Sequence, residues 1–167
     1  MHIELRKVQY AEFASEETNC FSADVYIDGK KAGTAHNDGH GGMTFIDPPA
    51  LQQKLDAYGA TLPRVVSKET PDEKDPTGFF TYAQNGESLI DDLLVAYLME
   101  RDVKRAMAKR VLFTMPGKPG IYQTKPMKKD DLTRVLADPA LATKLKAEKV
   151  LNLLPLPEAV ALYRERP

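Results

Sequence analysis

The sequence predicts an α+β fold, because strand patterns dominate the first half of the chain and helix patterns dominate the second half. Residues 21–27 alternate apolar and polar side chains, which is the period of a strand with one buried face. Residues 87–110 carry apolar side chains at helical spacing instead. We therefore expect an antiparallel sheet with hairpins in the N-terminal half, a long central helix, a second hairpin and short C-terminal helices.

The length of 167 residues and the ordinary composition, 43% hydrophobic and 28% charged, favour a single α+β domain over residues 1–167. Within it we expect a strand-rich part (1–67), a charged loop (68–78) and a helix-rich part (79–167). The single cysteine, Cys20, excludes an internal disulfide, and the chain shows neither a signal-peptide pattern nor a membrane-spanning apolar run. These features predict a cytoplasmic protein with no membrane partner.

The first strand is expected at residues 2–10, with a bulge after Lys7, where the alternation changes parity. Residues 12–19 are polar and connect this strand to the next, either as a helical turn or as a loop. The clean alternation of residues 21–27 predicts the second strand, and residues 30–37 run back beside it as the third.

The turn between these two strands decides where His36 points. Asp28-Gly29 is typical of a two-residue hairpin turn, which would pair Ile27 with Lys30 and place His36 on the apolar face. A three-residue loop would pair Ile27 with Lys31 instead and move His36 to the other face, because side chains alternate along a strand. The sequence leaves both registers open.

Residues 43–46 are expected to form a short strand, and Asp47-Pro48-Pro49 predicts a helix start with Asp47 as the capping acceptor. That helix would bury one apolar face and end near a glycine: its residues are Leu51, Leu55, Tyr58 and Gly59. Another strand is expected at residues 62–67. Three aromatic residues after the charged loop are expected to enter the core: Phe79, Phe80 and Tyr82.

The long helix is expected at residues 87–110, with Ser88 and Asp91 as its capping pair. Residues 93–99 are apolar on all sides, which predicts that this part is covered by more than one neighbour. The remaining elements are a hairpin at 111–125 around a turn at 116–120, a helix at 130–137, and helices opened by Asp138-Pro139 and by Pro157.

A glycine-rich loop is the first candidate site, for a small ligand. Its residues are Asn37, Asp38, Gly39, His40, Gly41 and Gly42. Successive glycines expose backbone amides that can hold a phosphate or carboxylate, and His40 adds a titratable group. The loop matches neither the phosphate-loop nor the dinucleotide-binding pattern, however. Turn chemistry explains the same residue types, because Asn, Asp and Gly tolerate positive φ angles, and we favour this interpretation.

The same stretch contains a spacing compatible with a metal site, because His36, Asp38 and His40 would point the same way on an extended strand. Gly39 is expected to break the extension, and no second group of ligands is present. We therefore predict neither a metal nor another cofactor.

Charge is segregated along the chain, although the net charge is only −1. Residues 1–100 carry 8 Lys and Arg against 17 Asp and Glu, whereas residues 101–149 carry 13 against 5. The candidate partner-binding residues lie in the basic segment: Arg101, Lys104, Arg105, Lys109, Arg110, Lys118, Lys125, Lys128 and Lys129. Such a segment binds an anionic partner, or is neutralised by the acidic half of the molecule. Nucleic acid is a possible partner, with Tyr122 as a stacking surface, but no nucleic-acid-binding signature is present.

Catalytic patterns are weak. The chain has no Gly-x-Ser-x-Gly nucleophile motif, and Cys20 at the start of a strand is typical of a buried, inert thiol. The adjacent Asp91 and Asp92 face different sides of a helix, which suits the helix dipole better than acid–base chemistry. The sequence favours a non-enzymatic protein without deciding the question.

Residues 17–30 (Glu-Thr-Asn-Cys-Phe-Ser-Ala-Asp-Val-Tyr-Ile-Asp-Gly-Lys) and 37–42 resemble uncharacterised small proteins carried by phages, plasmids and related mobile elements. The resemblance continues into the helix after Glu87 and the hairpin that follows. It implies a stand-alone accessory protein that binds a host or viral component, for example to block a bacterial defence system, and it carries no catalytic residue.

The leading hypothesis is therefore a non-enzymatic accessory binding protein that engages an acidic protein or ribonucleoprotein through residues 101–129. The alternatives are a small-molecule or nucleotide-binding protein or enzyme centred on residues 37–42, and direct binding of nucleic acid. The sequence names no partner and leaves the oligomeric state open.

Overall fold

The structure is a computed structural model that describes residues 1–164, apart from the side chains of Lys68 and Glu69. It contains 38% helix and 29% strand in antiparallel sheets, which confirms the α+β class, the N-terminal hairpins and the long helix. In the described part of the chain, no helix combines the length and the apolar character needed to cross a membrane.

The chain divides into two compact units, Met1–Val95 (unit 1) and Ala96–Pro167 (unit 2), and helix α2 (Gly86–Met107) contributes residues to both. The expectation of one domain over residues 1–167 stays a prediction. The division coincides with the segregation of charge. Unit 1 carries 8 Lys and Arg against 16 Asp and Glu, and unit 2 carries 15 against 8.

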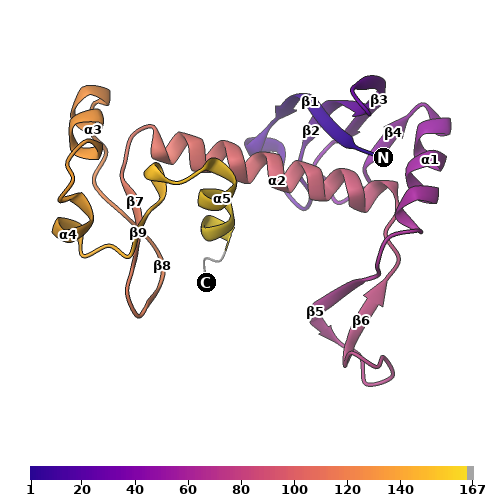
Figure 1. Cartoon of the computed structure of the whole chain (residues 1–167). Coiled ribbons are helices and arrows are strands. Elements are labelled where there is room, and N and C mark those ends of the chain that lie inside the picture. The colour runs from indigo at the N-terminus through magenta and orange to yellow at the C-terminus, as the bar shows by residue number, and fades with distance from the viewer. Residues whose placement is uncertain (165–167) are drawn as a thin grey trace. The chain divides into compact units, whose positions relative to one another are not determined.

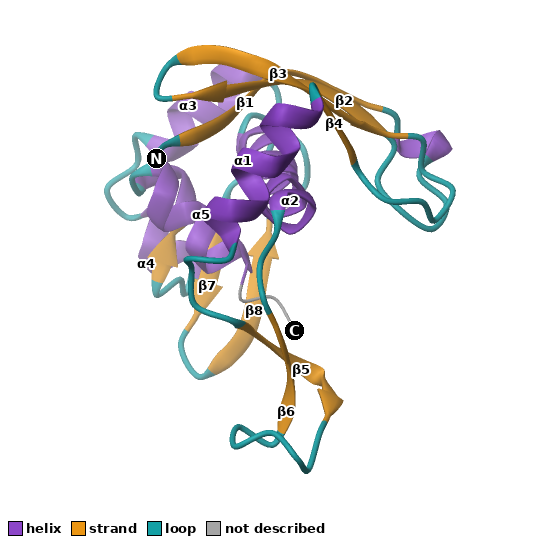
Figure 2. Ribbon diagram, turned by 90° about the vertical axis from the view of Figure 1, so that its right-hand side faces the viewer, coloured by secondary structure: helices purple, strands orange, loops and turns teal. Residues whose placement is uncertain are grey.

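Unit 1 is built on a four-stranded antiparallel sheet in the order β1-β2-β3-β4. Its strands are β1 (Ile3–Tyr10), β2 (Phe21–Ile27), β3 (Lys30–Asn37) and β4 (Phe45–Asp47), with a short 3₁₀ helix, η1 (Glu12–Ala14), between the first two. Helix α1 (Pro49–Gly59) and the N-terminal half of α2 lie beneath this sheet (Figures 1 and 2). The apolar face of β2 is buried, as are Leu51 and Leu55 of α1 and Ile90 and Leu94 of α2.

Two bulges shape the sheet. The predicted bulge in β1 is confirmed: the pairing with β2 shifts between Arg6 and Gln9, and Lys7 takes a φ of 51°. A second bulge, which the sequence did not indicate, lies in β3, where Tyr26 pairs with Lys31 but Val25 pairs with Gly33.

The position of His36 combines one part of each predicted alternative, because of the second bulge. The turn has two residues, because Ile27 pairs with Lys30, yet the extra residue in β3 pairs His36 with Ser22. His36 therefore lies on the outer face of the sheet, stacked on Phe45 with 5.2 Å between the ring centroids. Asn37 takes the buried position instead, opposite Phe21.

Two predicted helix caps are wrong. Asp47 is the last residue of β4 and makes no capping bond to α1, whose N-cap is Pro48. Helix α2 is capped by Asn85 rather than by a Ser88–Asp91 pair. The Asn85 side chain accepts a hydrogen bond from the Ser88 amide, and the Ser88 hydroxyl accepts one from the Asn85 amide.

The predicted all-round cover of residues 93–99 is also wrong, because Val95 and Tyr97 are 43% and 40% exposed. The charged loop is shorter than expected, since strand β5 (Val65–Pro71) extends into it and pairs with β6 (Phe79–Tyr82).

The expectation that the aromatic residues of β6 enter the core fails for Phe80 and Tyr82, which are 46% and 38% exposed. A two-stranded sheet has no second layer to cover them, so their rings stack on each other instead.

Unit 2 contains a three-stranded antiparallel sheet in the order β8-β7-β9. Its elements after α2 are β7 (Leu112–Met115), β8 (Lys118–Gln123), α3 (Lys129–Leu136), α4 (Leu141–Leu145), β9 (Lys149–Val150), η2 (Leu151–Leu153) and α5 (Leu156–Arg164). Alternation along β7 places Phe113 in one buried cluster with Leu132 and Leu141, and Leu112 in another with Val103 and Leu151. The second hairpin and the helices match the expected elements, whereas β9 was not predicted.

Candidate functional site

The glycine-rich loop is organised by the buried side chain of Asn37. Its Oδ1 accepts hydrogen bonds from the Gly39 amide and the Thr18 hydroxyl, both at 2.8 Å. Its Nδ2 donates to the Gly42 carbonyl at 2.9 Å and to the Thr44 hydroxyl at 3.4 Å. Asn37 is only 5% exposed, so these bonds satisfy an amide that would otherwise be buried at considerable cost.

Gly39 fits the loop against the segment that follows β1. Its carbonyl accepts hydrogen bonds from the amides of Glu16, Glu17 and Thr18. A Cβ at Gly39 would lie 2.0 Å from the Ala14 carbonyl oxygen, and its φ is +90°. Only glycine fits this position, for reasons of packing and of backbone conformation.

Two of the backbone amides that could hold an anion already have partners. The Gly39 amide is bound to Asn37, and the Gly41 amide donates to the Thr18 hydroxyl at 3.3 Å. A Cβ at Gly41 would meet the Glu17 carboxylate, so an acidic group lies where an anionic ligand would approach. The geometry favours the turn interpretation, and ligand binding by residues 37–42 stays a prediction.

The three candidate metal ligands do not converge. His36 stacks on Phe45, and His40 lies 3.2 Å from the Glu16 carboxylate on the surface. Asp38 is exposed. Among the residues that the structure describes, no three His, Cys, Asp or Glu side chains are placed to hold a metal ion.

A polar network extends from the loop to the start of α2. The Thr44 amide donates to Glu87 at 2.8 Å, and its hydroxyl donates to Asp91 at 2.7 Å. Burial, followed by repulsion from Glu87 and Asp92, raises the pKa of the Asp91 carboxyl, although the Thr44 hydroxyl opposes this rise. Thr18 and Thr44 could not be identified from the sequence, because they are isolated threonines with no local pattern around them.

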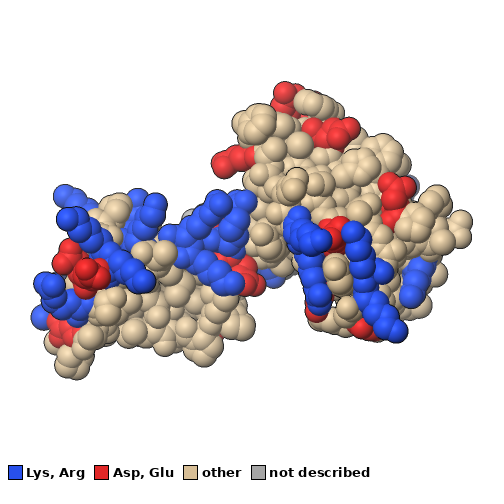
Figure 3. All heavy atoms as spheres, turned by 90° about the horizontal axis from the view of Figure 1, so that it is seen from above, with Lys and Arg blue, Asp and Glu red and all other residues tan. Residues whose placement is uncertain are grey.

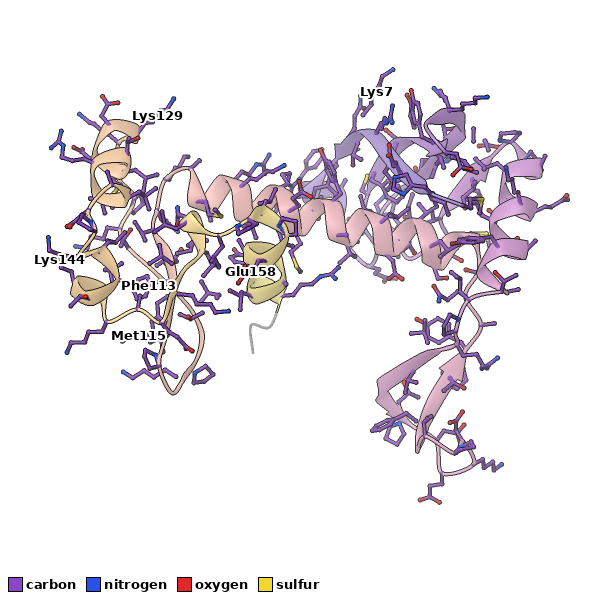
Figure 4. The ribbon with its side chains drawn as sticks, viewed as in Figure 1. Lys7, Phe113, Met115, Lys129, Lys144 and Glu158 are labelled. Carbon is purple, nitrogen blue, oxygen red and sulfur yellow. The ribbon has the colours of Figure 1, made fainter. Side chains whose placement is uncertain are left out.

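The second candidate site is the basic part of unit 2. Lys109 lies two residues past the end of α2, and its carbonyl accepts a hydrogen bond from the Met127 amide at 2.9 Å. The segment from Lys125 to Lys129 therefore lies against the C-terminal end of α2. Lys and Arg side chains gather over this unit in Figure 3, and Lys129 projects away from α3 in Figure 4.

Most of these cations lack an acidic partner. Within the described chain, no carboxylate lies within salt-bridge distance of the five exposed residues that we name the basic surface: Arg105, Lys109, Lys125, Lys128 and Lys129. Arg110 borders this surface, and its guanidinium donates to the Gln123 side chain at 2.9 Å. Positive charge that is not neutralised locally is available to an outside anion.

Three predicted partner-binding residues do not belong to this surface. Lys118 pairs with Met115 at the tip of the β7–β8 hairpin, at the opposite end from Gln123. Arg101 pairs with Asp102, and Lys104 pairs with Glu100. The basic surface and Arg110 thus account for six of the nine predicted residues, and partner binding by the nine stays a prediction.

Tyr122, proposed as a stacking surface for bases, packs on Phe113 with 5.9 Å between the ring centroids and lines a core cluster of unit 2. No protein-family model matches the chain, and no curated protein or solved structure matches it.

Proposed function

We propose that this chain is a non-enzymatic accessory binding protein that engages an acidic protein or ribonucleoprotein through its basic surface. The observation that carries the proposal is that Arg105, Lys109, Lys125, Lys128 and Lys129 have no carboxylate partner in the described chain. Complementary charge steers association and selects the partner.

The resemblance to proteins of phages and mobile elements supports a host or viral component as the partner. Inhibition of a bacterial defence complex is one role of this kind. Direct binding of nucleic acid is less well supported, because the Tyr122 ring packs on Phe113. It also requires a strong salt dependence that an experiment can detect.

The test is capture of partners from a bacterial lysate on three immobilised proteins, followed by mass spectrometry. The proteins are the wild type, the variant Lys109→Glu/Lys128→Glu/Lys129→Glu, and the control Lys30→Glu/Lys54→Glu/Lys74→Glu. Both variants change the net charge equally, but the control lysines are exposed residues of unit 1.

We expect the wild type and the control to capture the same acidic partners, and the basic-surface variant to lose them. Treating the lysate with ribonuclease separates a protein partner from an RNA. Capture of the same partners by the basic-surface variant, or of none by the wild type, would contradict the proposal.

A further inference from the structure

A groove of about 680 Å³ opens on unit 1, and its lining contains residues of that unit alone. It is lined by residues 43–46, by the first turns of α1 and by the start of α2. Its lining side chains are apolar or amide-bearing apart from Thr44 and two carboxylates, and no Lys or Arg contributes to it.

One side of the groove is apolar and open to solvent. Met43 is 63% exposed and Phe45 is 49% exposed, and Ile46 and Pro49 continue the apolar lining. Neighbouring large apolar side chains on a surface favour contact with an apolar group of a partner, because burial removes their area from water.

Each of the two carboxylates, Asp56 and Glu87, is held in place by hydrogen bonds to one of its two oxygens. Asp56 Oδ1 accepts hydrogen bonds from the Gly86 amide at 2.8 Å and the Gln52 side chain at 3.0 Å. Glu87 Oε1 accepts the Thr44 amide at 2.8 Å. Neither Asp56 Oδ2 nor Glu87 Oε2 has a partner in the described chain, so each carboxylate is held in place and keeps one oxygen for a cation.

The groove also follows the edge strand of the unit 1 sheet. β4 is the last strand of the unit 1 sheet, so its outer side has no strand beside it within residues 1–164. An edge of this kind can accept an extended segment of another chain.

We propose that this groove binds a short extended segment of a partner protein in which Lys or Arg alternates with apolar residues. The cations would meet the free oxygens of Asp56 and Glu87, and the apolar side chains would cover Met43 and Phe45. Charge complementarity selects this occupant, because the lining contains carboxylates and no cation, and unit 1 carries an excess of acidic residues. The proposal is independent of the basic surface.

The test starts from random octapeptides displayed on phage and selected on the immobilised full-length protein. The enriched sequences are synthesised with a fluorescent label, and their dissociation constants are measured by anisotropy. The groove variant Met43→Lys/Gln53→Lys adds two cations at exposed lining positions whose side chains make no hydrogen bond within the described chain. The control Phe13→Lys/Gln9→Lys adds the same two charges, in place of one apolar residue and one glutamine, at exposed positions outside the groove lining.

We expect enrichment of peptides that alternate basic and apolar residues, a loss of affinity of tenfold or more in the groove variant, and no loss in the control. Thermal melts check that both variants stay folded. Failure to enrich such peptides, enrichment of acidic peptides, or equal affinity for both variants would overturn the proposal. Peptide affinity is also measured in millimolar magnesium or calcium chloride and in sodium chloride of the same ionic strength. Weaker peptide binding in the divalent salt alone would assign the carboxylates to a divalent cation and would also overturn the proposal.

Discussion

The glycine-rich loop and the basic surface are both candidate sites in the sequence, but their polar groups differ in whether they have partners within the described chain. In the loop, Asn37, Gly39 and Thr18 bond to one another and to the neighbouring backbone. On the basic surface, Lys109 and Lys128 have no acidic partner within the described chain. Groups satisfied inside the molecule stabilise it, and groups left unsatisfied at the surface are available to a partner.

We therefore expect the loop to contribute to stability, and we propose that the basic surface contributes to binding. Substitutions in the loop should therefore change the free energy of unfolding most, and substitutions on the basic surface should change it least.

Replacing Asn37 with Ala should lower the free energy of unfolding by roughly 3 kcal/mol, because several buried hydrogen-bonding groups lose their partner together. Urea denaturation measures the change. The neighbouring Asp38→Ala is the control: Asp38 is exposed, and its loss should cost less than about 0.5 kcal/mol. Equal losses of stability in the two variants would show that the Asn37 hydrogen bonds do not organise the loop.

Replacing Gly39 with Ala should cost roughly 2 kcal/mol, since the new Cβ would strain the backbone at a φ of +90° and clash with the Ala14 carbonyl. Gly42 is the matched control, because a Cβ there meets nothing within 4 Å and its φ is not positive. If Gly42→Ala destabilises the protein as much as Gly39→Ala, contact with the segment after β1 is not the reason that position 39 requires glycine.

Asp91 gives the unit 1 network a pH dependence. Its pKa is raised above the ordinary 3.8, mainly by burial, so the folded protein holds the proton more tightly than the unfolded chain. The stability contributed at this site is therefore full below pH 3.8 and falls as the pH rises through the folded-state pKa.

The variant Asp91→Asn keeps an acceptor for the Thr44 hydroxyl and removes the titration. Its melting temperature should gain on the wild type as the pH is raised from acid to neutral. A difference between the two proteins that stays constant over this range would show that Asp91 does not titrate abnormally.

The elements of the fold could be predicted from the sequence because their signals are local. The alternation of residues 21–27 and the turn residues Asp28-Gly29 lie within the hairpin that they specify. The bulge in β3 is different, because a Cβ at Gly33 would lie 1.9 Å from the Asp47 carbonyl oxygen. This close approach of β4 is a tertiary contact that no local pattern reveals, and the bulge beside it places His36 on the outer face.

The candidate sites, too, could be predicted from the sequence only where their signals are local. The basic segment is evident from the charges in the sequence. The separation of Lys118 from Lys125 depends on the folded hairpin, and the pairing of Lys104 with Glu100 depends on the helix. The cap at Asn85 did have a sequence signal, since Asn followed three residues later by Ser places an acceptor and a hydroxyl at the right spacing.

Two groups of exposed residues should have little effect on stability. His40→Ala removes only a surface pair with Glu16 and should cost less than about 0.5 kcal/mol. The triple substitution of Lys109, Lys128 and Lys129 by Glu should shift the thermal midpoint by only a few degrees, because none of these lysines is in an ion pair within residues 1–164. Unfolding of either variant at room temperature would show that these side chains support the fold.

The most direct test of the comparison measures the affinity for one captured partner with three proteins: the wild type, His40→Ala and the triple basic-surface variant. We predict that His40→Ala binds within twofold of the wild type, and that the basic-surface variant binds at least tenfold more weakly, with a difference that shrinks as salt is added. Loss of binding in His40→Ala with full binding in the triple variant would contradict the account and place the functional site in the glycine-rich loop.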